Sequence, residues 1–221
     1  MKNNLFFLQE SLPFWKNLNE NQKNLLLNSS FLKTFLKNTI LSGNNNECTG
    51  FLIVKSGQLR IYSNSDNGKE ITLYRLLDFD SCIFSASCML KNINFDISIS
   101  FEKDSEVIII PSDIFNNLSE DNVYVKSFVL DLVSSRFSDV MWIFEQYVFS
   151  NMAQRLANTL LEQASLNNSK SLDITHEYIA RELGTAREVI TRLLKQFQAD
   201  NIVKLSRNKI EILNLDELQK T

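Results

Sequence analysis

The stretch from Ile174 to Ile202 constrains the fold of this chain most, because its apolar spacing predicts two short helices joined by a tight turn. The first helix is expected to begin at Thr175, a residue that caps helix N-termini well, and to end just before Gly184. Glycine accepts the positive φ that often follows a helix C-terminus. We expect Thr185 to cap the second helix, which should begin near Ala186.

The second predicted helix has one apolar and one polar face. The apolar residues at helical spacing are Val189, Ile190, Leu193, Leu194 and Phe197. The opposite stripe carries Arg187, Glu188, Thr191, Arg192 and Lys195. Arginine can pair with O6 and N7 of guanine, and glutamate can accept a hydrogen bond from the cytosine amino group. The pattern therefore predicts a helix-turn-helix that binds double-stranded DNA in the major groove, although an ordinary helical hairpin with solvated charges has similar spacing.

The segment Leu205 to Leu213 predicts a short hairpin directly after these helices. The Arg-Glu-x-x-x-Arg pattern followed by such a wing resembles the CRP/FNR family of bacterial transcription factors. The resemblance implies base reading by Arg187 and Glu188, with Ala186 in the small position and Thr191 and Arg192 as the trailing pair. It also implies phosphate contacts from Thr175 and His176 and backbone contacts from Arg207 and Lys209. The predicted DNA-binding residues are therefore Thr175, His176, Thr185, Ala186, Arg187, Glu188, Thr191, Arg192, Lys195, Arg207 and Lys209.

The first half of the chain is expected to form β structure after a helical opening. Asn19 and Gln22 resemble a capping box. Apolar alternation then predicts strands at 50–55, 58–63, 70–76 and 106–110, and 66–68 has the composition of a hairpin turn. This region resembles the cyclic-nucleotide-binding domains of the same family. The expected fold is α+β, with a β-roll sensor domain at 1–121, a dimerisation helix at 122–149 and a winged helix-turn-helix at 150–221.

The central helix is expected to join two copies of the chain into a homodimer. Its residues Val133, Phe137, Val140, Phe144 and Tyr147 follow a heptad spacing. The alternative is a core helix of a monomer. A seam of this length would supply the two-fold symmetry that pairs two recognition helices on DNA. The break at 149–151 is expected to act as a hinge.

The sensor region lacks the residues that hold a nucleotide phosphate. Family members that bind cyclic AMP place a Gly-Glu pair and an arginine there, but 79–96 contains neither glycine nor arginine. Val140 and Met141 stand where such proteins place adjacent hydroxyl groups. We therefore expect no cyclic nucleotide binding and a more apolar pocket, for which the sequence assigns no effector.

Three cysteines, Cys48, Cys82 and Cys88, raise the question of a redox sensor. An iron–sulfur cluster of the FNR type needs four thiolates, several of them near the N-terminus, so none is expected. Haem is also not expected, because His176 is the only histidine and lies in the DNA-binding part. A thiol switch between Cys82 and Cys88 stays open beside the reading of both as small buried residues. The candidate pocket or switch residues are Cys82, Phe84, Cys88, Val140 and Met141.

The remaining composition agrees with a cytoplasmic regulator. The chain has 221 residues and a formal charge of −3, while 175–210 alone carries a net charge of +3. No apolar run is long enough for a membrane span or a signal peptide, and no catalytic or metal-binding group of residues suggests an enzyme. RNA polymerase is a further partner that the family resemblance implies. A ligand- or redox-responsive module acting on a protein partner is the alternative function.

Overall fold

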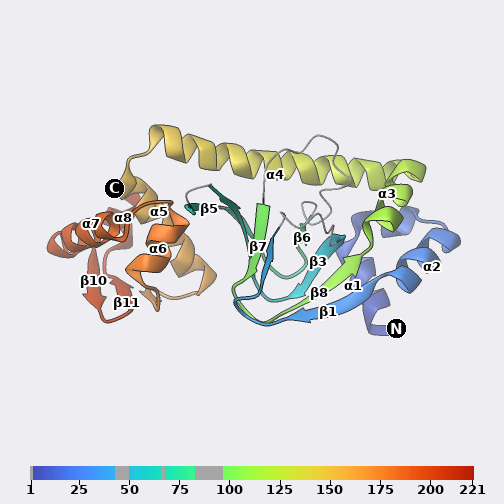
Figure 1. Cartoon of the computed structure of the whole chain (residues 1–221), viewed down its shortest axis with the longest axis horizontal. Coiled ribbons are helices and arrows are strands. Elements are labelled where there is room, and N and C mark those ends of the chain that lie inside the picture. The colour runs from blue at the N-terminus through green and yellow to red at the C-terminus, as the bar shows by residue number, and fades with distance from the viewer. Residues whose placement is uncertain (1, 43–49, 66–67, 83–96) are drawn as a thin grey trace. The chain divides into compact units, whose positions relative to one another are not determined.

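A computed structural model describes residues 2–42, 50–65, 68–82 and 97–221 of the chain. They divide into two compact units, which are described separately. The first consists of Met1–Ser63 with Leu73–Val140, and the second of Asn64–Thr72 with Met141–Thr221. The fold is the mixed helix and strand arrangement that the sequence predicts (Figure 1).

Two four-stranded sheets form the roll of the first unit, in the orders β1-β8-β3-β6 and β2-β7-β4-β5. The strands of the first sheet are β1 (Phe31–Phe35), β3 (Phe51–Ser56), β6 (Ser81–Cys82) and β8 (Ser105–Ile110). Those of the second are β2 (Ile40–Ser42), β4 (Leu59–Asn64), β5 (Glu70–Leu76) and β7 (Ile97–Phe101). Antiparallel registers such as Leu52 opposite Ile109 and Ile61 opposite Ile99 place apolar side chains between the sheets. The four predicted strands are confirmed; the predicted turn residues 66 and 67 lie outside the described residues.

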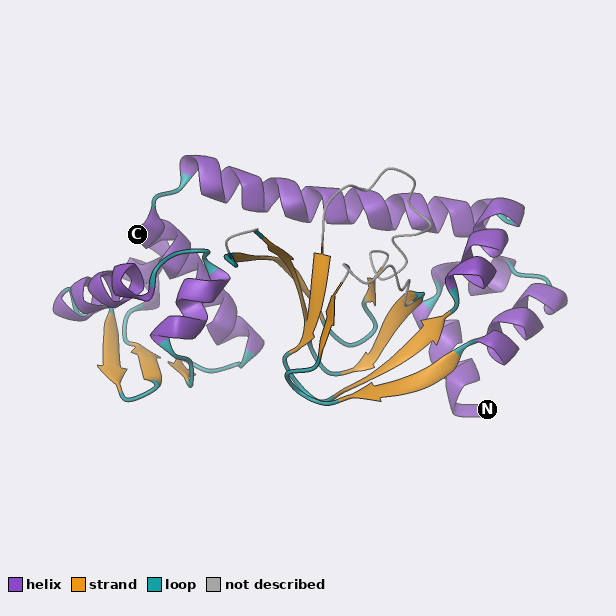
Figure 2. Cartoon of the chain, in the orientation of Figure 1, coloured by secondary structure: helices purple, strands orange, loops and turns teal. Residues whose placement is uncertain are grey.

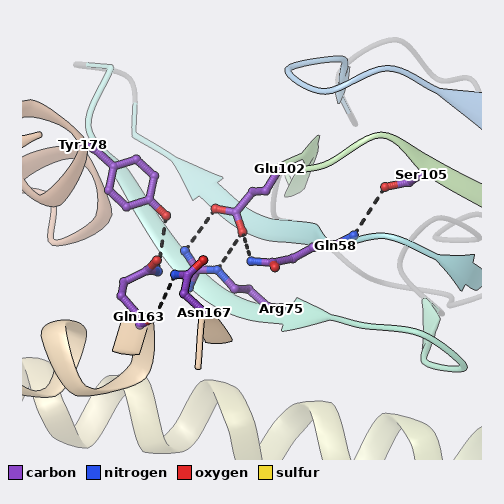
Figure 3. A network of polar contacts seen from close by, with 7 residues as sticks. All are labelled: Gln58, Arg75, Glu102, Ser105, Gln163, Asn167 and Tyr178. Atoms are coloured by element: carbon purple, nitrogen blue, oxygen red, sulfur yellow. Dashed lines mark hydrogen bonds and ion pairs between the residues drawn. The ribbon is translucent and has the colours of Figure 1, made fainter. Parts of the chain in front are cut away.

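A buried ion pair holds the turns of the roll together. Arg75 on β5 donates from Nε to Glu102 at 2.8 Å, and Gln58 donates to the same carboxylate at 2.7 Å (Figure 3). Gly57 precedes Gln58 with a φ of +121°, and a Cβ there would lie 2.1 Å from Ser105 Oγ. A side chain at position 57 would therefore displace the neighbouring turn.

Helices cover one end of the roll. They are α1 (Lys2–Ser11), the 3-10 helix η1 (Pro13–Asn17), α2 (Glu20–Ser29) and α3 (Ser112–Asp121). The capping box predicted for α2 is confirmed, because Asn19 and Gln22 each accept the other's backbone N–H. Phe51 on β3 stacks on Phe115 of α3 with ring centroids 4.0 Å apart. These helices therefore form an apolar core with β3 and β8.

The central helix α4 runs without interruption over Val123–Phe149, as the sequence predicts (Figure 2). The next helix, α5, covers Met152–Leu166. Asn151 begins α5 with a capping box, accepting from the backbone N–H of Ala153 and Gln154. The helix therefore ends at the predicted break, and the next one starts at Met152 after two non-helical residues.

The second unit contains the helix pair and hairpin that the C-terminal sequence predicts. Its further elements are β9 (Ser171–Leu172), α6 (His176–Glu182), α7 (Arg187–Ala199), β10 (Val203–Ser206), β11 (Lys209–Ile212) and α8 (Leu215–Lys220). The strands form one antiparallel sheet in the order β10-β11-β9. One apolar core joins α5, α6, α7 and the sheet, with Leu160, Ile190 and Leu194 fully buried. The strand β9 and the helix α8 were not predicted from the sequence.

Candidate DNA-binding site

The first helix of the pair, α6, begins at the predicted capping residue. Thr175 accepts a hydrogen bond from the backbone N–H of Tyr178 at 3.0 Å. Ile179 and Ala180 face inward and are buried. Tyr178 also contacts α5, because its hydroxyl lies 3.4 Å from Nε2 of Gln163, whose carbonyl accepts from Asn167 (Figure 3). This contact links α6 to α5 within the second unit.

The turn after α6 is a Schellman motif. Gly184 has a φ of +60°, its N–H donates to the Arg181 carbonyl, and the Thr185 N–H donates to the Ala180 carbonyl. The expectation that Thr185 caps the next helix is wrong. Ala186 is the N-cap of α7 and gives no side-chain hydrogen bond. The backbone of Thr185 completes the end of α6 instead, so the following residue starts the new helix.

The recognition helix candidate, α7, is strongly amphipathic. Ile190, Leu194 and Phe197 are buried in the core. The residues that face outward line one shallow concavity, and they are Arg187, Glu188, Thr191, Arg192 and Lys195. This is the complete polar stripe predicted from the sequence. Four of its members are exposed, while Thr191 is half-buried.

A second groove lies between the start of α6, the start of α7 and the wing β10-β11. Its lining includes Thr175, His176, Arg187, Arg207 and Lys209. Arg207 and Lys209 are exposed at the turn of the wing. The structure therefore brings together the residues expected to contact the DNA backbone. The cations Arg187, Arg207 and Lys209 outnumber the carboxylate of Glu177 in this lining, and a positive balance suits a phosphate group.

One contact between α6 and α7 was not predicted. Nδ1 of His176 lies 3.0 Å from the Thr191 hydroxyl, which itself donates to the Arg187 carbonyl at 2.9 Å. Because the hydroxyl proton points to that carbonyl, Nδ1 of His176 carries the proton and donates to Thr191. Burial, followed by the charge of Arg187, lowers the pKa of His176 below its ordinary value. A contact between residues 15 positions apart on two helices leaves no periodic signal in the sequence.

The outward surface of α4 carries apolar side chains. Phe137 is 66% exposed and Phe144 is 56% exposed, while Val140 is half-buried. Of the other two predicted seam residues, Val133 packs against the core of the first unit, and Tyr147 is hydrogen-bonded within the second unit. Further exposed large hydrophobic residues on α4 are Val123, Tyr124, Leu130, Met141, Trp142, Val148 and Phe149. The dimer interface stays a prediction.

The candidate pocket residues are only partly described. Cys82 is fully buried in the apolar core between the sheets, beside Tyr74, whose pKa is raised first by burial. Phe84 and Cys88 lie outside the described residues, as does Cys48. Val140 is half-buried and Met141 is exposed. Among residues 2–42, 50–65, 68–82 and 97–221, no group of three or more metal-binding side chains occurs. No helix in the same ranges is long and apolar enough to cross a membrane.

The fold and the site together define a winged helix-turn-helix regulator that carries a β-roll domain. Two family models match the chain: the Crp-like helix-turn-helix domain over residues 154–221 and the cyclic nucleotide-binding domain over residues 32–122. A crystal structure from Eubacterium rectale, assigned to the CRP/FNR family of transcriptional regulators, is similar at 46% identity with a TM-score of 0.92. The match covers 96% of this chain and 100% of that one.

More distant relatives agree with this result. The regulatory protein HlyX of Actinobacillus pleuropneumoniae is 25% identical over 194 residues, which is 84% of this chain and 79% of HlyX. The c-di-GMP-responsive global regulator CLP of Xanthomonas campestris shares the fold, with 17% identity and a TM-score of 0.72 over 89% of this chain and all of CLP. The chain belongs to the CRP/FNR family of transcriptional regulators and has a helix-turn-helix DNA-binding domain.

Proposed function

We propose that this regulator binds, as a homodimer, a DNA site with two-fold symmetry, placing α7 of each copy in the major groove. The observation that carries the proposal is the single outward stripe of Arg187, Glu188, Thr191, Arg192 and Lys195. The buried face of α7 holds this stripe on a rigid core. The cationic groove beside the wing lies next to it and shares Arg187. Base edges and backbone can thus be contacted from one surface.

The two surfaces have different roles. Arg187, Glu188 and Arg192 project from α7 and are exposed, so they can reach base edges. Lys209 lies on the wing strand β11 and lines the groove beside the start of α7, so it can contact phosphate. Phosphate contacts give affinity without sequence preference, because every base pair carries the same phosphates. Arg187, Glu188 and Arg192 therefore recognise the base sequence, and Lys209 positions the protein on the DNA backbone.

A competition assay over half-site variants tests this division. Arg192→Ala should remove a bidentate base contact worth ~1–3 kcal/mol and relax the preference at one guanine. Lys209→Ala should weaken binding to all variants alike. It should also reduce the slope of log affinity against log salt concentration by about one. If Arg192→Ala lowered affinity uniformly without changing the ranking of variants, Arg192 would be a backbone contact. A shallow salt dependence of the unmodified protein would argue for a protein partner instead.

The exposed face of α4 supports the homodimer. Phe137 and Phe144 lie seven residues apart, so both are on one side of the helix. Leu130, Met141 and Val148 extend the same face and are exposed. Apolar side chains in such a row are stabilised when a second copy covers them. A two-fold axis along α4 would pair two recognition helices about one DNA turn, ~34 Å, apart.

We further propose that cyclic nucleotides are not effectors of this protein. The β-roll belongs to the cyclic nucleotide-binding fold, but 79–96 provides no arginine and no glycine for a phosphate. Most of this segment, 83–96, lies outside the described residues. Isothermal calorimetry with cyclic AMP and cyclic GMP should detect no saturable binding at micromolar concentration. Saturable binding would overturn this part of the proposal.

A further inference from the structure

The carbonyl of Leu183 accepts two side-chain hydrogen bonds at the turn of the helix-turn-helix. The Tyr147 hydroxyl donates to it at 2.9 Å, and Nη2 of Arg155 donates at 2.8 Å. The Arg155 guanidinium also stacks over the Tyr147 ring, 3.4 Å from its centroid. Three elements thus meet at one backbone atom: the last turn of α4, the first turn of α5 and the end of α6.

This carbonyl belongs to the group that a helix leaves without internal partners. Leu183 is the C-cap of α6, and the final carbonyls of a helix need hydrogen-bond donors from outside it. Leu183 is buried and Arg155 is only 9% exposed, so solvent competes weakly for these hydrogen bonds. A charged donor in such a site makes a stronger hydrogen bond than a neutral one. The contact therefore holds the end of α6 firmly.

Tyr147 makes this contact from the other side of the helix break. It precedes Ser150 and Asn151, where α4 ends and α5 begins, whereas Leu183 follows them by more than 30 residues. The Tyr147 phenol lies directly beside Gly184, since a Cβ at that position would be in van der Waals contact with the hydroxyl oxygen at 3.4 Å. The hydrogen bond therefore ties the direction of the last turn of α4 to the turn that precedes α7.

We propose that Tyr147 and Arg155 form a clamp on Leu183 that fixes the angle of α7 against the end of α4. In the homodimer, that angle sets how far apart the two recognition helices stand, and so which half-site spacing the protein accepts. The inference rests on the proposed function. Tyr147 acts as a positioning residue, since it contacts the turn and not the DNA.

Tyr147→Phe is the test variant, because it keeps the ring beneath Arg155 and removes only the donated hydroxyl. Binding is measured on palindromic DNA whose half-site spacing is changed one base pair at a time. The unmodified protein should bind one spacing more tightly than its neighbours. In the variant the ratio of these affinities should fall roughly two- to tenfold, because one hydrogen bond contributes about that much to binding. The ranking of half-site sequences should stay the same. Tyr124→Phe, an exposed tyrosine on the same helix, is the matched control and should change neither measurement.

Hydrogen exchange in the DNA-free protein provides an independent result. The amide protons of Gly184 and Thr185 close the turn and should exchange roughly two- to tenfold faster in Tyr147→Phe. Unchanged exchange at both amides, or an unchanged spacing preference, overturns the clamp. If the unmodified protein binds all DNA sequences equally well, the proposed function is wrong, and the proposal about half-site spacing is then wrong as well. Circular dichroism establishes that the variant is folded.

Discussion

Replacing Phe137 and Phe144 together with alanine should separate the proposed homodimer into monomers. Full burial of a large apolar side chain stabilises by about 1.5–3 kcal/mol. These rings are 66% and 56% exposed, so a partner can remove roughly 60% of that surface from water, about 1–2 kcal/mol for each ring. Two positions in each of two copies then contribute about 4–7 kcal/mol. The dimer dissociation constant should rise roughly 10³- to 10⁵-fold.

Sedimentation equilibrium measures this constant directly. Phe6→Ala is the matched control, since Phe6 is 64% exposed and lies on α1. It removes the same chemical group from a different surface and should leave the dissociation constant unchanged. Thermal unfolding tests whether the double variant is still folded, which we expect because neither ring is in a core of the described chain. A folded double variant whose dissociation constant stays within about threefold of the original refutes the interface and the calculation.

Other predictions concern stability and pH. Gly184→Ala should lower the free energy of unfolding by about 1 kcal/mol or more, measured by urea denaturation, because φ is +60° and the new Cβ would lie 3.2 Å from the Glu70 carbonyl oxygen. Glu102→Gln should destabilise the roll by about 3 kcal/mol, because it leaves the charge of Arg75 buried without its counterion; thermal unfolding measures this. The imidazole of His176 should titrate by NMR below its ordinary pKa of 6.5; its contribution to stability is present above pH 6.5 and is lost as the pH falls through the folded pKa.

Local features of the fold could be predicted because short stretches of sequence determine them. Asn19 with Gln22, Thr175 and Gly184 each act within three to five residues, through hydrogen bonds that those residues make with neighbouring backbone. The outward stripe of α7 could be predicted for the same reason, since helical spacing alone selects one face. Thr185 shows the limit of this approach. This threonine lies one position before the N-cap of α7, and its backbone N–H closes the turn that ends α6.

Contacts between distant residues could not be predicted in this way. Arg75 and Glu102 are 27 positions apart, and they meet because β5 and the turn after β7 belong to one roll. His176 and Thr191 meet because α6 and α7 pack against each other in one core. Each pair follows from the arrangement of elements, which a single sequence does not state. The buried surroundings of such pairs decide their energy, so their importance is visible only in the folded chain.

The central helix shows where periodicity becomes ambiguous. Phe137 and Phe144 define a line along α4, and apolar residues flank it on both sides, Val140 with Tyr147 and Met141 with Val148. A heptad pattern fits either pair, because one pair follows Phe137 and Phe144 by three residues and the other by four. In the folded chain Met141 and Val148 are exposed, whereas the Tyr147 hydroxyl is bonded to a carbonyl 36 residues further on. A tyrosine can satisfy an apolar pattern with its ring and a polar contact with its hydroxyl. The proposed dimer face of Phe137, Phe144, Met141 and Val148 and the proposed Tyr147 clamp are thus neighbouring faces of one helix, and substitutions at Phe144 and Tyr147 should separate dimerisation from the positioning of α7.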